Sequence, residues 1–260
     1  MSSYEPLSPR AFMERRWRRF TDCRHAASWN RIPVTAPEAV QVGSELPLFF
    51  SATDHSAELI ALTGLKDGQS DLLDANGQWR TRYQPALVRC APFRLLPLDK
   101  SSSKKAVCVD LDSGWVDDYP SDQPDVPELE RFFPAGQTQP SEAVAKTIDF
   151  LKELEGHRLR TQKAIDQLFE QDLLQPVAHE QLQALPGLLT IKEKRLNELD
   201  GETFLKLRAS GALPLIYVQL LSAHQLPRLL AWSQQAARSN PADVDLDQVF
   251  GEASDDLFRF

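Results

Sequence analysis

The pattern of apolar and polar positions divides the chain into two parts. Before residue 134, short apolar runs alternate with turn-forming stretches, which is typical of an antiparallel sheet of about five strands with short helices. From Pro140 onward, apolar residues recur at helical spacing. We therefore predict an α+β fold, with an N-terminal sheet part (residues 1–134) packed against a helical C-terminal part (residues 135–239). Residues 240–260 form an acidic tail that is either disordered or docked on the body as an extended strand.

Several short elements are expected in the N-terminal part. Residues 8–23 show helical apolar spacing behind a capping Ser8. Residues 46–51 form an apolar run that indicates a buried strand, and residues 57–65 are interpreted as a short helix that stops at a glycine. Pro33 indicates an edge strand or a loop. The pair Asn76-Gly77 predicts a tight hairpin turn.

Two strands are expected after this turn. Alternation over residues 79–83 places Trp79 and Tyr83 on one face and Arg82 on the other. Residues 86–95 continue the alternation and place Arg89 on the face that a core would use.

A guanidinium on a core face needs a partner, because an unpaired buried charge is costly. Arg89 therefore has two interpretations. It forms a buried arginine–carboxylate clamp that fixes strand register, or it captures a ligand carboxylate or phosphate with help from Tyr83 and Trp79.

The later segments predict one more strand and a series of helices. Residues 106–111 indicate a strand, and the Phe132-Phe133 pair anchors a proline- and glycine-rich seam between the two parts. A helix capped by Ser141 is weakened at Gly156, where a second helix follows. Beyond these lie a short strand at residues 188–191 and further helices up to residue 238.

Composition and charge argue against several classes of function. The chain of 260 residues carries a net charge of -8, which disfavours a surface for nucleic acid or other polyphosphates. The run Arg15-Arg16-Trp17-Arg18-Arg19 is interpreted as a solvated helix face around a buried Trp17. The chain begins without an apolar leader, and no apolar run approaches the ~18 residues of a membrane span. We expect a cytoplasmic protein without a transmembrane segment.

No reacting group stands out. Cys23, Cys90 and Cys108 are too dispersed for a zinc site or a disulfide framework, and they are expected to be small buried thiols. Phosphate-loop, dinucleotide and esterase motifs are missing from the sequence. We therefore expect no catalytic residue, no metal and no cofactor.

One group of short motifs resembles a known family. The string Gly77-Gln-Trp79, Tyr83-Gln-Pro85-Ala86 and Arg89-Cys-Ala-Pro92-Phe93 is similar to the SapC family of bacterial proteins. Further similarity lies at residues 47–50, 62–65, 194–199 and 204–207, so the resemblance covers residues 33–230.

The resemblance implies a link to a surface-layer locus and to genomic neighbourhoods with outer-membrane nutrient receptors, and it supplies no catalytic residue. The peptide-transporter permease of the same name is an unrelated membrane protein.

Three functions follow as hypotheses. The first is a non-catalytic accessory protein that binds a protein, a peptide or an amino acid through Trp79, Arg82, Tyr83 and Arg89. The second is a metal- or cofactor-dependent enzyme that acts on an amino acid or peptide. The third is a structural surface-layer component.

Overall fold

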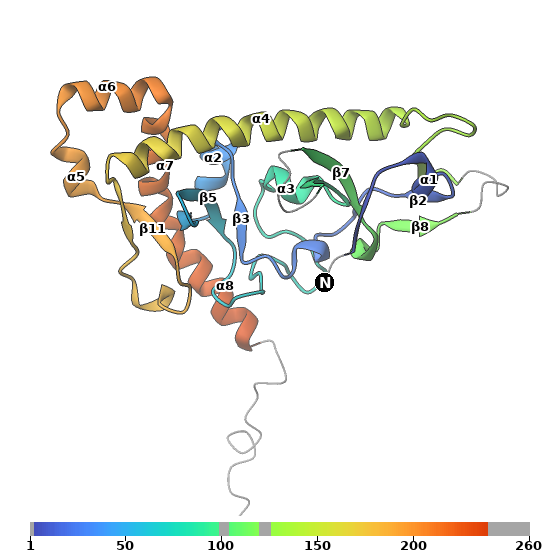
Figure 1. Ribbon diagram of the computed structural model, residues 1–260. Helices are drawn as coiled ribbons and strands as arrows, with labels where there is room; N and C mark the ends of the chain where they lie inside the picture. Colours follow the sequence, from blue (N-terminus) through green and yellow to red (C-terminus); the bar gives the residue numbers. More distant parts are fainter. Residues whose placement is uncertain (1–2, 99–103, 120–125, 239–260) are drawn as a thin grey trace, which may run out of the picture.

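Three antiparallel sheets and one long helix, α4 (Glu142–Glu170), form the body of the protein (Figure 1). The structure is a computed structural model that describes residues 3–98, 104–119 and 126–238. Strands dominate before residue 134 and helices after it, so the predicted α+β fold class is confirmed. The expected single sheet of about five strands is instead three sheets, because the chain crosses repeatedly between separate strand pairs.

The largest sheet joins strands from both parts of the chain. Its five strands lie in the order β10 (Leu174–Pro176), β11 (Leu188–Ile191), β4 (Leu48–Ala52), β5 (Ala57–Leu62) and β3 (Arg31–Pro33). The predicted strands at β4 and β11 are confirmed. β3 lies at the edge, as its proline predicts. The C-terminal part therefore contributes two strands as well as its helices.

The helix predicted for residues 57–65 is wrong, because this segment forms β5. Strands β4 and β3 flank β5 on both sides, and α4 packs against it. All its residues except Glu58 are buried. A strand enclosed in this way has a continuous apolar sequence, which periodicity alone does not distinguish from a buried helix.

The two smaller sheets contain three strands each. One has the order β1 (Tyr4–Pro6), β7 (Lys105–Asp110) and β6 (Phe93–Pro97), and the other has the order β8 (Val116–Asp118), β2 (Arg15–Trp17) and β9 (Glu130–Arg131). The predicted β7 strand is confirmed.

The helix predicted for residues 8–23 is present only as α1 (Pro9–Phe12), which Ser8 caps as expected. Within the remainder, Arg15–Trp17 forms β2, because pairing with two strands about a hundred residues away overrides the local helical spacing, and residues 18–23 are irregular. The arginine-rich run is thus no solvated helix face. Trp17 is buried as predicted, but Arg16 is buried as well.

The two strands predicted for residues 79–83 and 86–95 are wrong over most of their length. Residues 79–83 follow an irregular path, and a short helix, α3 (Ala86–Arg89), begins directly after Pro85. The Ala91–Pro92 peptide bond is cis, and β6 begins at Phe93. The alternation therefore does not describe which side chains face the core here.

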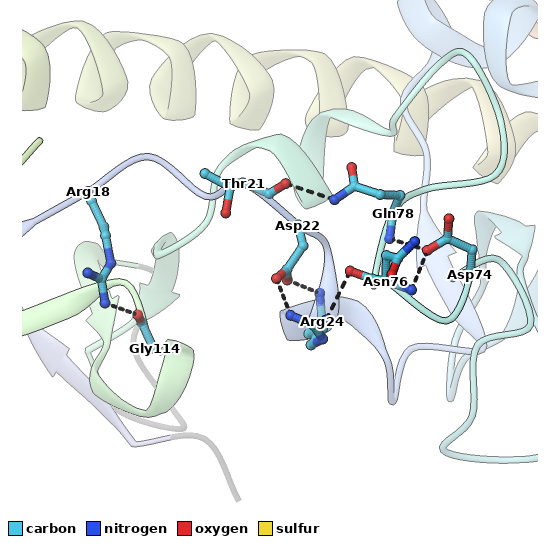
Figure 2. A network of polar contacts seen from close by, with 8 residues as sticks. All are labelled: Arg18, Thr21, Asp22, Arg24, Asp74, Asn76, Gln78 and Gly114. Atoms are coloured by element: carbon cyan, nitrogen blue, oxygen red, sulfur yellow. Dashed lines mark hydrogen bonds and ion pairs between the residues drawn. The ribbon is translucent and has the colours of Figure 1, made fainter.

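The predicted turn at Asn76-Gly77 is confirmed, and it docks onto the N-terminal segment (Figure 2). Gly77 alone of the pair has a positive φ, of 77°, so only one of the two turn positions is left-handed, where the expected hairpin geometry requires both. The Asp74 carboxylate accepts the Asn76 and Gln78 amides at 2.8 Å each. Arg24 donates to the Asn76 carbonyl at 3.0 Å. The turn thereby fixes the start of the Trp79 segment.

The helices of the C-terminal part follow the predicted order. Ser141 caps α4, which continues through Gly156 as one helix because both of its halves pack on the body. Figure 1 shows α4 running along most of the length of the body. The other α-helices are α2 (Ala36–Gly43), α5 (Glu193–Asn197), α6 (Gly201–Ser210), α7 (Ala212–Ser222) and α8 (Leu226–Arg238). Short 3₁₀ turns occupy Arg24–Ala26, Leu111–Ser113, Glu180–Leu182 and Ala223–Gln225.

Two separate clusters of buried side chains lie under α4. The first core surrounds the five-stranded sheet and includes Phe50, Leu59 and Ile165. The second core is aromatic and lies under the first half of α4, with Phe12, Trp17, Phe93, Phe132 and Phe133. The Phe132-Phe133 pair is therefore buried as an anchor, as predicted.

Two predictions concern the C-terminal stretch and the division of the chain into two parts. The acidic tail, residues 240–260, lies outside the described residues. The division at residue 134 stays a prediction, and α4 packs on both cores. Among the described helices, no single one has the length and apolar character of a membrane span. One pair bent by 88°, Gly201–Ser210 with Ala212–Ala236, meets that test by length and composition only.

Candidate functional site

The segment from Trp79 to Tyr83 is held in place by hydrogen bonds that converge on its end. The Glu45 carboxylate accepts the Arg82 amide at 2.8 Å and the Tyr83 amide at 3.3 Å. The Tyr83 carbonyl accepts the Trp79 indole N–H at 3.2 Å and the Thr81 hydroxyl at 2.9 Å. These bonds replace the sheet ladder that alternation predicted, and they give Tyr83 a fixed position.

Glu38 connects this segment to the start of α3. Its carboxylate is buried and reaches back to the Thr35 amide at 3.2 Å, as in a capping box at the start of α2. The other oxygen, Oε2, accepts the Ala86 amide at 2.7 Å and the Tyr83 hydroxyl at 3.2 Å. Burial first, and then the Glu38 charge, raises the pKa of Tyr83, while Arg89 opposes this shift.

Arg89 is exposed, so the prediction of a buried arginine–carboxylate clamp is wrong. It lies at the end of a helix, where period-2 alternation does not apply. Its guanidinium donates to the Gln84 carbonyl at 3.1 Å and to the Tyr83 hydroxyl at 3.3 Å. The same group lies 5.5 Å from the ring centroids of both Tyr83 and Phe150. It therefore occupies a fixed position between two rings and has no carboxylate partner among residues 3–98, 104–119 and 126–238.

The structure brings three of the four predicted site residues together. Tyr83 and Arg89 contact each other directly, and Trp79 bonds to the Tyr83 backbone. Trp79 is only 9% exposed, so it supports Tyr83 from behind and offers little surface to a ligand. The Arg82 side chain is exposed and forms no hydrogen bond or ion pair within the described part of the chain.

An open groove passes Arg89 on one flank of α4. Its larger hollow, of about 520 Å³, lies between α4 and the Gln84–Phe93 stretch, and a smaller one of about 180 Å³ continues past Tyr83. Arg89 and Phe150 line both hollows, so the two are neighbours on this flank of α4. We call the two hollows together the α4 groove; from α4 it is lined by Ala143, Lys146, Thr147, Phe150, Glu153, Leu154 and His157.

The larger hollow of the α4 groove combines positive charge with aromatic rings. Arg19, Arg89 and Lys146 supply the charge, and its rings come from Trp17, Phe20, Phe93 and Phe150. Arg19 pairs with Glu130 at 3.4 Å, and Lys146 pairs with Glu142 at 2.6 Å. Both ion pairs are largely exposed, and such pairs contribute little stability and exchange readily. An anionic ligand could therefore recruit both cations.

A more enclosed chamber of about 150 Å³ lies beneath α4 and shares Thr35, Glu38 and Leu154 with the α4 groove. Glu155 there binds Arg158 at 2.8 Å and Lys105 at 2.9 Å, and the hydrogen bond from Arg158 is the main reason that the pKa of Glu155 falls to about 2. Glu58 faces the same two cations, yet burial raises its pKa.

Sequence reasoning missed the contribution of Glu38 and of α4. The spacing of Thr35 and Glu38 before an apolar run was a visible sign of a capping box. No local pattern could place Lys146 and Phe150 beside Arg89, because they are about sixty residues away in the chain. A further hollow of about 530 Å³ lies between α1 and β8 and is lined by Arg10, Arg15 and Tyr119, among others.

The described residues offer little for nucleophilic chemistry. All three cysteines are free and buried, as predicted. Burial raises the pKa of Cys23 and of Cys90 to about 11, so neither thiol ionises readily near neutral pH. Burial also lowers the pKa of His25, whose Nε2 lies 3.1 Å from the Val88 carbonyl. No group of three His, Cys, Asp or Glu residues that could hold a metal ion occurs in the described ranges.

Comparison with known protein families assigns the chain to a family. The family model named SapC matches residues 7–229, which is most of the chain. The chain belongs to the SapC family. This confirms the resemblance seen at residues 77–93 and extends it to the segment before residue 33, where the sequence motifs were weaker. Searches of curated proteins and of solved structures gave no match.

The residues that match the family model include those that line the α4 groove. The SapC match includes β2, the Tyr83–Phe93 stretch and all of α4, which together form the groove. The site is therefore built from the part of the chain that defines the family. The match carries no assignment of activity or ligand.

Proposed function

We propose that this SapC protein is a non-catalytic binding protein, and that the α4 groove takes an acidic peptide segment with aromatic side chains. The observation that carries the proposal is Arg89. Its guanidinium is exposed, held between two rings and free of any carboxylate partner among the described residues. Arginine in a fixed orientation is suited to bidentate capture of a carboxylate.

The shape of the groove supports a peptide more than a compact metabolite. Its two neighbouring hollows are open to solvent and follow α4 over residues 143–157. At 1.5 Å per residue, these helical positions span ~21 Å. About six residues of extended chain cover that length. Cations beside aromatic rings would bind acidic and aromatic side chains in alternation.

The setting of this function is also a proposal. A cytoplasmic accessory role, with a link to envelope or nutrient-receptor loci, is what the resemblance to the SapC family suggests.

The test compares Arg89→Ala with Arg82→Ala, a matched exposed arginine seven positions earlier. The probes are two fluorescein-labelled, C-terminally amidated hexapeptides, one alternating Asp and Phe and one alternating Lys and Phe. We expect the acidic probe to bind, and Arg89→Ala to raise its Kd about tenfold or more. Arg82→Ala should change the Kd by less than about twofold, because its side chain lines neither hollow.

The same experiment can overturn the proposal. If the two variants lose the same amount of affinity for the acidic probe, the probe is attracted by net charge and does not bind at a defined site. Absence of acidic-probe binding at concentrations up to about 1 mM would exclude the groove as a peptide site of useful affinity. Arg89→Lys separates charge from geometry, and a loss close to that of alanine would indicate bidentate capture.

A further inference from the structure

The C-terminal stretch of the chain has the chemistry that the α4 groove requires. Residues 239–260 contain six acidic residues and one arginine, which gives net -5 out of -8 for the whole chain. This stretch ends in Asp255-Asp256-Leu257-Phe258-Arg259-Phe260. Two carboxylates are followed there by two phenylalanines at alternate positions. No other stretch of the chain combines acids and rings in this spacing.

We infer that residues 255–260 bind in the α4 groove of the same chain and compete with its peptide ligand. The inference rests on the proposed function and adds regulation to it. Asp255 and Asp256 would pair with Arg89 and Lys146. Among the described residues Arg89 has no carboxylate partner, and Lys146 pairs with the exposed Glu142. Phe258 and Phe260 would lie against Phe20 and Phe150, which are both partly exposed in the larger hollow.

The lengths agree with this arrangement. Six extended residues cover ~20 Å, close to the ~21 Å that the groove follows along α4. Residues 239–254 connect α8 to this segment, and these sixteen residues can span up to ~55 Å when extended. The 29-residue helix α4 is ~43 Å long and runs along most of the body in Figure 1. The connecting stretch is therefore long enough to reach the groove from the end of α8.

Because residues 239–254 connect the segment to the body, even weak binding would keep the α4 groove largely occupied. A flexible connection of this length holds the segment at an effective concentration of about 1 mM near its site. A segment with a Kd of ~100 μM would then occupy the groove in roughly nine molecules out of ten. An external peptide must displace it, so its apparent affinity would fall about tenfold.

The first experiment locates the tail by zero-length carboxyl–amine cross-linking of the full chain at low protein concentration. We expect Asp255 or Asp256 to couple to Lys146. Lys152 is the matched control, since it is also exposed on α4 and paired with an acid of its own helix, Asp149, but does not line the groove. Equal coupling to Lys146 and Lys152, or coupling to neither, would overturn the inference. A mixture of ¹⁵N-labelled and unlabelled chains identifies links between two molecules, and these too would contradict binding within one chain.

The second experiment measures competition in the full-length protein with the acidic hexapeptide probe. The variant Asp255→Asn with Asp256→Asn should bind the probe about five- to tenfold more tightly than the parent. The control variant Asp243→Asn with Asp245→Asn removes the same charge from the same stretch and should change the Kd by less than about twofold. Similar Kd values for the parent and both variants would overturn the inference.

The two proposals fail in different ways. If Arg89→Ala weakens the probe but the Asp255/Asp256 variant does not strengthen it, the groove is a peptide site without a competing tail. If Arg89→Ala has no effect on the probe, the proposed function itself is wrong.

Discussion

The two cores under α4 differ in whether they contain a unit that forms locally. In the first core β3, α2, β4 and β5 follow each other within residues 31–62, and later segments such as β11 are added to this unit. The second core joins Phe12, Trp17, Phe93 and Phe132, and its sheets pair Tyr4 with Asp110 and Arg15 with Asp118. Closing such long loops costs more entropy than forming a hairpin.

This difference suggests a hierarchy of stability. The first core should be able to form by itself, whereas the second core depends on α4 being anchored over the first. Arg89 lies where the two meet, since Tyr83 packs on the first core and Phe150 on the second. A groove at such a border can respond to small shifts between the cores without either core unfolding.

The largest expected effects come from removing one ring from each core. Phe132→Ala and Phe50→Ala each delete a fully buried phenylalanine and should each cost about 3–5 kcal/mol of unfolding free energy. They should differ in hydrogen exchange. Phe132→Ala should expose the amides of β2, β6 and β7 while β4 and β5 stay protected, and Phe50→Ala should lower protection in both cores. Uniform loss of protection in Phe132→Ala would refute the hierarchy.

A smaller effect is expected at the connection between the cores. Glu38→Ala leaves the buried Thr35 and Ala86 amides without an acceptor and frees the Tyr83 hydroxyl, which should cost about 3 kcal/mol. Glu45→Ala is the control, because this half-buried carboxylate also accepts two backbone amides in the same region and should cost about 1 kcal/mol. Urea unfolding measures both. Equal costs would mean that Glu38 has no special role at the border.

The sequence predicted the elements that depend on local signals. The caps at Ser8 and Ser141, the turn at Gly77 and the sheet edge at Pro33 were predicted correctly, because each depends on residues a few positions apart. The failures at β2 and β5 involve strands whose partners or burial are set by tertiary pairing. Local spacing carries no information about a partner a hundred residues away.

The candidate site was predicted in part for the same reason. Tyr83 and Arg89 were identified by their chemistry and do meet, since they are six residues apart. The expected environment of Arg89 was wrong because Pro85 begins a helix where alternation indicated a strand. Lys146 and Phe150, which complete the groove, come from a helix whose position depends on both cores.

The smallest predicted effect concerns Glu58 and Glu155, two glutamates in the chamber beneath α4 whose pKa values shift in opposite directions. Glu58 belongs to β5 in the first core, whereas Glu155 is on α4 and binds Lys105 of β7 on the side of the second core. Because the folded pKa of Glu155 is depressed to about 2, its contribution to stability is present above its ordinary pKa of 4.5 and is lost as the pH falls towards 2. The folded pKa of Glu58 is raised, so the folded state loses stability as the pH rises from 4.5 through that raised value.

Glutamine substitutions should therefore have opposite signs at neutral pH. Glu155→Gln should lower the unfolding free energy at pH 7 by less than about 1 kcal/mol, since solvent screens its ion pairs, and should have almost no effect near pH 2. Glu58→Gln should leave stability at pH 7 unchanged or slightly higher, because the neutral amide avoids burying a charge. Urea unfolding of both variants across this pH range gives the comparison. If both variants instead lower the unfolding free energy at pH 7, Glu58 shares the two cations with Glu155. The border between the cores would then be stabilised by one joint ion network.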